Sequence, residues 1–157
     1  MLYHIQRVAA GLLLTLVITE SAAAGDSVQV GDIEIDTPWA RASIGISRPA
    51  VAYLTIRNAG DQPDRLLAVE SPKAGHAMLH DSLVEDGVMK MTPLEAADIP
   101  SQSEFAFEPG GAHIMLMDLQ QPLVEGEQLP LTLVFERAGP IEIIAQIGGL
   151  AAKEPPN

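Results

Sequence analysis

The chain has 157 residues, no cysteine and a formal net charge of −12. The negative charge argues against a nucleic-acid partner, because binding to phosphates requires a positively charged surface. Without cysteine the chain has neither a disulfide nor a thiolate nucleophile, so packing alone must stabilise the fold.

The first 24 residues have the three-part layout of a secretory signal peptide. Met1–Arg7 carries a positive charge, Val8–Ile18 is an apolar run, and Ser21–Ala24 supplies small residues before Gly25. The apolar run is shorter than the roughly 20 residues that a membrane-spanning helix needs. We therefore expect residues 1–24 to be a cleaved signal peptide rather than a buried helix. No cysteine and no second long apolar run follow, so we expect neither a lipid anchor nor stable membrane insertion of the cleaved protein.

The remaining sequence predicts one all-β domain over residues 25–150 and a short flexible tail over residues 151–157. Short segments with alternating or β-branched residues are separated by Pro, Gly and Asp clusters, a pattern typical of a β-sandwich or barrel. A short helical turn around Leu94–Ala97 is also compatible with the sequence. The predicted strands are Val28–Ile35, Ala50–Arg57, Arg65–Val69, Ala77–Val84, Val88–Thr92, Glu104–Phe107, Ala112–Met117, Leu129–Glu136 and Ile141–Ile147.

Asp86-Gly87 lies between two alternating segments, which is a strong local signal for a β-hairpin. A two-residue loop predicts a register in which His80 lies opposite Pro93 and Met91 lies opposite Ser82. His80 and Met91 then share one face of the hairpin as diagonal neighbours, about 7–8 Å apart between Cα atoms. Two long side chains at this separation can converge on one ion.

After the signal peptide, every His and Met of the chain lies between His76 and Met117. The stretches GHAMLHDSL at 75–83 and GAHIMLMDL at 111–119 place these residues at alternate positions, and alternate residues of a strand share one face. Such clustering in so short a window requires an explanation.

Two explanations are open. Met fills irregular gaps in hydrophobic cores, so a methionine on a strand is accounted for by packing alone. His and Met together on one face of two separate segments instead indicate a metal site. The pairs are His80 with Met91 and His113 with Met115.

The types of donor atom limit which metal ions can bind. A thioether is a neutral, soft ligand that suits Cu(I) and binds Zn²⁺, Ca²⁺ and Mg²⁺ poorly. A blue-copper electron-transfer centre requires a cysteine, which the chain lacks. The sequence also has no GxSxG or HExxH motif and no other catalytic signature, so we expect a protein that is not an enzyme.

The spacing of the four donors is specific: His80, ten residues, Met91, twenty-one residues, His113, one residue, Met115. This arrangement resembles the signature of the periplasmic copper chaperone family called PCu(A)C. Further segments resemble that family over nearly the whole chain after the signal peptide. They are TPWARAS at 37–43, AYLTIRNAG at 52–60, EDGVMKM at 85–91, PGGAHIMLMDL at 109–119 and LTLVFERAG at 131–139.

The resemblance implies a cupredoxin-like Greek-key β-sandwich or barrel that binds one Cu(I) ion through His80, Met91, His113 and Met115. It also implies a periplasmic location and a chaperone that delivers copper for the assembly of cytochrome c oxidase. We expect a monomer whose partner is subunit II of the oxidase or another oxidase assembly factor. The tail lacks the His and Met residues that many members carry there, so we expect no second, Cu(II) site in it.

Two alternatives to a copper-delivering chaperone are open, and so is the role of His76 and Met78. A periplasmic copper-buffering or resistance protein without a dedicated recipient would have the same ligand set. A metal-free binding module would bury His80 and His113 as part of its packing. His76 and Met78 match no ligand position of the family, and we expect them to be incidental rather than a loading site.

Overall fold

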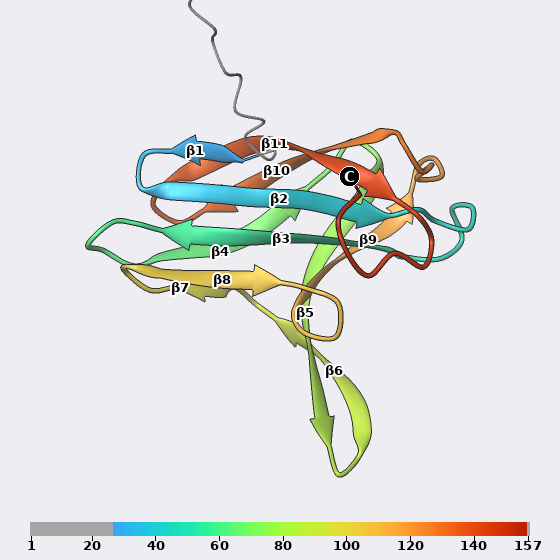
Figure 1. Ribbon diagram of the computed structural model, residues 1–157, viewed down its shortest axis with the longest axis horizontal. Coiled ribbons are helices and arrows are strands. Elements are labelled where there is room, and N and C mark those ends of the chain that lie inside the picture. The colour runs from blue at the N-terminus through green and yellow to red at the C-terminus, as the bar shows by residue number, and fades with distance from the viewer. Residues whose placement is uncertain (1–26, 157) are drawn as a thin grey trace, which may run out of the picture.

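The computed structural model describes residues 27–156, and over this range it contains eleven β-strands and no helix (Figure 1). The predicted signal peptide lies outside the described residues. None of the described residues form a helix with the length and hydropathy needed to cross a bilayer. The strands are β1 (Val28–Val30), β2 (Ile33–Arg41), β3 (Ala50–Asn58), β4 (Asp64–Glu70), β5 (Ala74–Glu85), β6 (Val88–Leu94), β7 (Ala97–Ile99), β8 (Ser103–Phe107), β9 (His113–Leu119), β10 (Gln128–Phe135) and β11 (Gly139–Gly148).

The strands form one mixed sheet in the order β6-β5-β9-β3-β2-β11-β10-β4-β7, with β1 paired to β2 and β8 paired to β3. The pair β11–β2 is parallel, and the other neighbours are antiparallel. Because β2 and β11 come from opposite ends of the domain, their pairing ties the two ends of the chain together. Many strands that are neighbours in the sheet are not consecutive in the sequence, so crossover connections join them.

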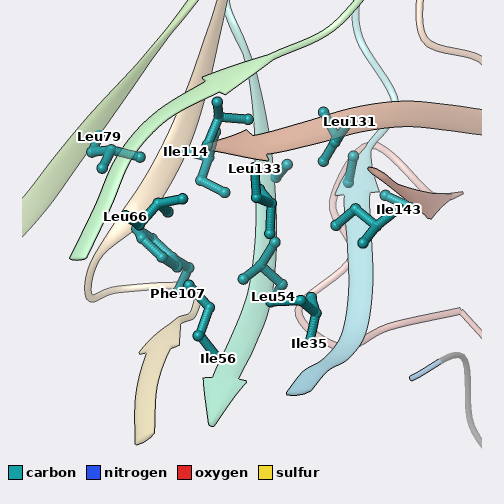
Figure 2. Close-up of a cluster of buried hydrophobic side chains, with 14 of the residues drawn as sticks. Ile35, Leu54, Ile56, Leu66, Leu79, Phe107, Ile114, Leu131, Leu133 and Ile143 are labelled. Atoms are coloured by element: carbon teal, nitrogen blue, oxygen red, sulfur yellow. The ribbon is translucent and has the colours of Figure 1, made fainter. Parts of the chain in front are cut away.

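One hydrophobic core fills the space between the strands (Figure 2). It forms because alternate residues of each strand point inward, as in β10, where every second residue from Leu129 to Phe135 is buried. Full burial of one Leu or Ile side chain stabilises the fold by about 1.5–3 kcal/mol. Figure 2 shows the core residues Ile35, Leu54, Ile56, Leu66, Leu79, Phe107, Ile114, Leu131, Leu133 and Ile143.

The strand predictions are largely confirmed, with three corrections. The segment Val28–Ile35 is two strands, because the turn at Gly31, which has a φ of 59°, folds β1 back onto β2. β2 then continues to Arg41, beyond the predicted end. The helical turn around Leu94–Ala97 is wrong: Leu94 ends β6, and Ala97 begins the short strand β7, where it pairs with Leu66 of β4.

The hairpin formed by β5 and β6 has the predicted register, with His80 opposite Pro93 and Met91 opposite Ser82. Asp86 and Gly87 both have positive φ, 53° and 76°, as a tight two-residue hairpin turn requires. Figure 1 shows the hairpin projecting away from the rest of the domain. The apolar side chains of its projecting part are exposed. They are Leu83, Val84, Val88, Met89 and Met91.

The last described residues lie beside the ends of β2 and β11. Arg41 Nε donates a hydrogen bond to the carbonyl oxygen of Ala152 at 2.7 Å. A Cβ atom at Gly148 would lie 3.4 Å from Pro156 Cδ. The tail therefore has at least these contacts with the domain, and its flexibility stays a prediction.

Candidate metal centre

His80 and His113 are direct cross-strand partners in the antiparallel pair β5–β9. Their rings are stacked, with centroids 5.7 Å apart and planes inclined by 16°. Both lie on the face of the sheet opposite to the core, since their neighbours Leu79 and Ile114 point into the core. We call this side of β6, β5 and β9 the outer face.

Each ring carries one buried nitrogen with no partner. Across residues 27–156, neither His80 Nδ1 nor His113 Nε2 has a hydrogen-bonding partner. The other nitrogen of His113, Nδ1, lies 3.1 Å from the carbonyl oxygen of Gly111. A carbonyl can only accept, so Nδ1 carries the proton and Nε2 presents its lone pair. A buried polar atom without a partner costs about 1–3 kcal/mol, which a bound metal ion would offset.

The two methionines of the predicted set lie on the same outer face. Met115 is two residues after His113 on β9, and it is half-buried. Met91 is the diagonal neighbour of His80 on β6, and 58% of its surface is exposed. The structure thus brings the four predicted residues onto one face of three neighbouring strands. Their binding to a metal stays a prediction.

The chemistry of this donor set fits a soft monovalent ion. Two neutral imidazoles and two thioethers add no negative charge, and thioethers favour Cu(I). Over the part of the chain that the structure describes, no group of three or more His, Asp or Glu side chains is placed to hold a metal ion. The donors that accompany the histidine pair on the outer face are the thioethers of methionine.

An aromatic pair that sequence analysis missed lies on the neighbouring strands. Val51 of β3 is the cross-strand partner of Met115, and Tyr53 follows it on the same face. The Tyr53 ring packs on Trp39 at a centroid distance of 4.7 Å. Burial raises the pKa of Tyr53, and the nearby Arg41 guanidinium, 5.5 Å from the ring centroid, lowers it in part. The segment TPWARAS indicated the family but gave no sign of this position beside the predicted ligands.

Met78 and His76, which we expected from the sequence to be incidental, also lie on the outer face. Met78 is the direct partner of Met115, and His76 is the partner of Met117. The signal that would have found them is the antiparallel alignment of GHAMLHDSL with GAHIMLMDL. Sequence alone does not give the register between strands that are distant in the chain.

Comparisons with known proteins agree with this geometry. Residues 33–147 match the family described as "Putative lipoprotein LpqE-like". The match extends from the start of β2 almost to the end of β11. The chain belongs to the LpqE-like family.

This chain is also similar to solved structures of PCuAC domains, which confirms the predicted family. The apo PCuAC domain from PmoF1 is 33% identical with a TM-score of 0.67, and the match covers 78% of this chain and 98% of that domain. The copper-bound PCuAC domain from PmoF2 is 31% identical with a TM-score of 0.68, and the match covers 78% of this chain and 97% of that domain. The predicted cupredoxin-like Greek-key fold is confirmed as well.

A relative from Leifsonia xyli subsp. xyli, named "Putative lipoprotein Lxx21020", is 29% identical over 108 residues. The match covers 68% of this chain and 64% of that relative. The chain thus spans less than two thirds of the relative's length.

Proposed function

We propose that this protein is an exported, non-enzymatic chaperone that binds one Cu(I) ion through His80, Met91, His113 and Met115. The observation that carries the proposal is the stacked histidine pair, in which two buried nitrogens have no partner among the described residues. The neighbouring thioethers favour Cu(I) over harder ions. A copper-bound structure of a 31% identical PCuAC domain supports the same cargo.

The two halves of the site would differ in rigidity. His113 and Met115 lie on β9 between β5 and β3, and the opposite face of β9 is packed in the core. Met91 lies on the projecting hairpin and is largely exposed. Release of the ion would then proceed by ligand exchange, in which a donor of the recipient displaces the thioether of Met91 first. No electron needs to move, because the copper stays Cu(I) during the exchange.

The proposed role is delivery of copper for the assembly of the copper sites of cytochrome c oxidase. The recipient would be subunit II or another oxidase assembly factor, and we place the transfer in the periplasm with a monomeric, single-domain carrier. The family and the spacing of the four donors support this role. The signal-like residues 1–24 and the lipoprotein name of the Leifsonia relative support export.

Binding is tested by titrating Cu(I) into the protein without oxygen, against a competing chelator. The wild type should take one tightly bound equivalent, and the double variant His80→Ala/His113→Ala should lose it. Met89→Leu is the matched control, because Met89 is an exposed methionine of the same hairpin outside the proposed ligand set. Equal binding by the wild type and the double variant would end the proposal.

Delivery is tested separately from binding. Cu(I)-loaded protein is mixed with the soluble copper-binding domain of oxidase subunit II, and the copper content of each is measured after separation. Transfer that is faster than release to the chelator supports a dedicated recipient. If copper leaves the protein no faster with the domain than without it, and oxidase activity at low copper is unchanged in a deletion strain, the protein is a copper buffer.

A further inference from the structure

The outer face of β5 and β9 carries three successive cross-strand pairs of soft donors. We call these pairs the donor ladder. Successive pairs are about 7 Å apart, because two residues along a strand span this distance. The proposed copper site uses only the first pair and one member of the second. The pairs are His80–His113, Met78–Met115 and His76–Met117.

The outermost histidine lies beside a carboxylate. His76 Nδ1 lies 3.2 Å from Asp118 Oδ2. The carboxylate lies on the Nδ1 side of the ring, so Nε2 is the nitrogen left to bind a metal. In many metal sites a nearby carboxylate orients the histidine ligand through its other ring nitrogen.

The backbone around this contact is specialised. Asp118 has a φ of 50°, which is unusual for a residue other than glycine. A Cβ atom at Gly75 would lie 2.9 Å from the Cβ atom of Asp118, closer than real contacts allow. The glycine next to His76 therefore leaves the space that Asp118 occupies.

Exposure increases along the ladder. His113 is only 5% exposed, whereas Met78 is 39% exposed and the side chain of His76 is 53% exposed. Met117 is half-buried beside His76. The ladder thus runs from a histidine pair with one buried member, His113, to donors that solvent can reach.

We propose that His76, Met78 and Met117 form a second, weaker Cu(I) position at the exposed end of the ladder. His76 Nε2 and the two thioethers supply one nitrogen and two sulfurs, a set that suits Cu(I). This inference rests on the proposed function, because the position lies beside the proposed copper site on the same strands. Met78 lies opposite Met115, so an ion can pass between the two positions by exchanging one thioether for another. Copper stays Cu(I) throughout, and no proton is released.

A purely structural explanation makes a different prediction. An exposed contact between a histidine and a carboxylate, such as His76–Asp118, contributes little to stability. In that case the contact would order the surface of β9 and bind no metal. The two explanations differ in the number of Cu(I) ions that the protein takes up.

The first measurement is native mass spectrometry of the protein titrated with Cu(I) in the absence of oxygen. We expect two ions per chain, the second bound at least about tenfold more weakly. The variant His76→Ala/Met117→Leu should bind only the tight ion, and His113→Ala should keep only the weak one. Met89→Leu, the matched control, should bind both.

A second measurement assigns the donors directly. In protein labelled with ¹³C at the methionine methyl groups, the signals of Met91 and Met115 should shift with the first equivalent of Cu(I). The signals of Met78 and Met117 should shift with the second, while that of Met89 stays in place. A wild type that binds one ion, or a His76→Ala/Met117→Leu variant that keeps both, overturns this inference and leaves the proposed function intact. A wild type that binds none overturns both.

Discussion

Strand β5 has two environments, and the comparison between them is informative. Its first half pairs with β9, and there Leu79 is buried in the core while His80 faces the buried His113. Its second half pairs only with β6 in the projecting hairpin, where Leu83 and Val84 are 54% and 71% exposed. The same strand therefore changes from a core element to an exposed arm within a few residues.

This difference divides the proposed ligand set. His80, His113 and Met115 lie where the sheet is packed, so their positions are fixed before any ion arrives. Met91 lies on the exposed hairpin, which is attached to the domain by fewer contacts. A carrier needs both properties, because it must hold the ion tightly and still release it to another protein.

The largest expected effect compares two leucines of β5. Leu79→Ala should reduce the free energy of unfolding by about 2–5 kcal/mol, because it leaves a cavity in the core. Leu83→Ala should change it by no more than about 0.5 kcal/mol, because Leu83 is already exposed. Chemical denaturation of both variants measures the difference. Similar losses of unfolding free energy in both variants would show that Leu83 is packed against the domain, contrary to its exposed position.

The second effect concerns the buried half of the metal site. His113→Ala should weaken Cu(I) binding by at least about 100-fold, because even the supporting groups of metal sites contribute roughly 10–100-fold. Competition with a Cu(I) chelator measures the change. A loss below about tenfold would mean that the buried nitrogen of His113 is not a ligand.

The third effect concerns the exposed half. Met91→Leu should weaken Cu(I) binding on the order of tenfold, less than His113→Ala, and should accelerate copper release to a chelator. The free energy of unfolding should change by no more than about 0.5 kcal/mol, because the side chain is largely exposed. Stopped-flow release and denaturation curves test the two statements. A slower release than in the wild type would contradict the assignment of Met91 as the ligand that leaves first.

The smallest effect concerns Tyr53, whose pKa is raised by burial. The folded protein then holds this proton at pH values where the unfolded chain has lost it, so stability falls as the pH rises above about 10. Tyr53→Phe should remove that part of the decrease and leave stability at pH 7 to 9 with little pH dependence from this site. Thermal unfolding between pH 8 and 11 provides the test. If the stability of the variant and of the wild type changes with pH in the same way, burial does not raise the pKa of Tyr53.

Local sequence signals predicted much of the fold. The Asp86-Gly87 turn fixed the register of the β5–β6 hairpin, because a two-residue loop leaves no freedom in the pairing. Alternation of apolar residues located most strands. The short strand β7 was missed, because three residues carry no usable periodicity and depend on pairing with β4.

The candidate site was only partly predictable. The spacing from His80 to Met115 indicated four donors, and the structure places them on one face. The pairing of β5 with β9 was not predictable, because these strands are far apart in the chain and their register depends on the whole fold. For that reason the sequence gives Met78 no role, whereas the structure places it directly opposite Met115. The positive φ of Asp118, which brings its carboxylate to His76, also has no local sequence signal.

The proposed function requires two histidines and two methionines to bind one Cu(I) ion on the outer face. X-ray absorption spectroscopy of the protein loaded with one equivalent of Cu(I) tests it most directly, because it counts the donors around the metal. We expect two nitrogen and two sulfur neighbours, and the loss of one sulfur in Met91→Leu. A copper environment that contains only nitrogen and oxygen, or one that is unchanged in Met91→Leu, would contradict it.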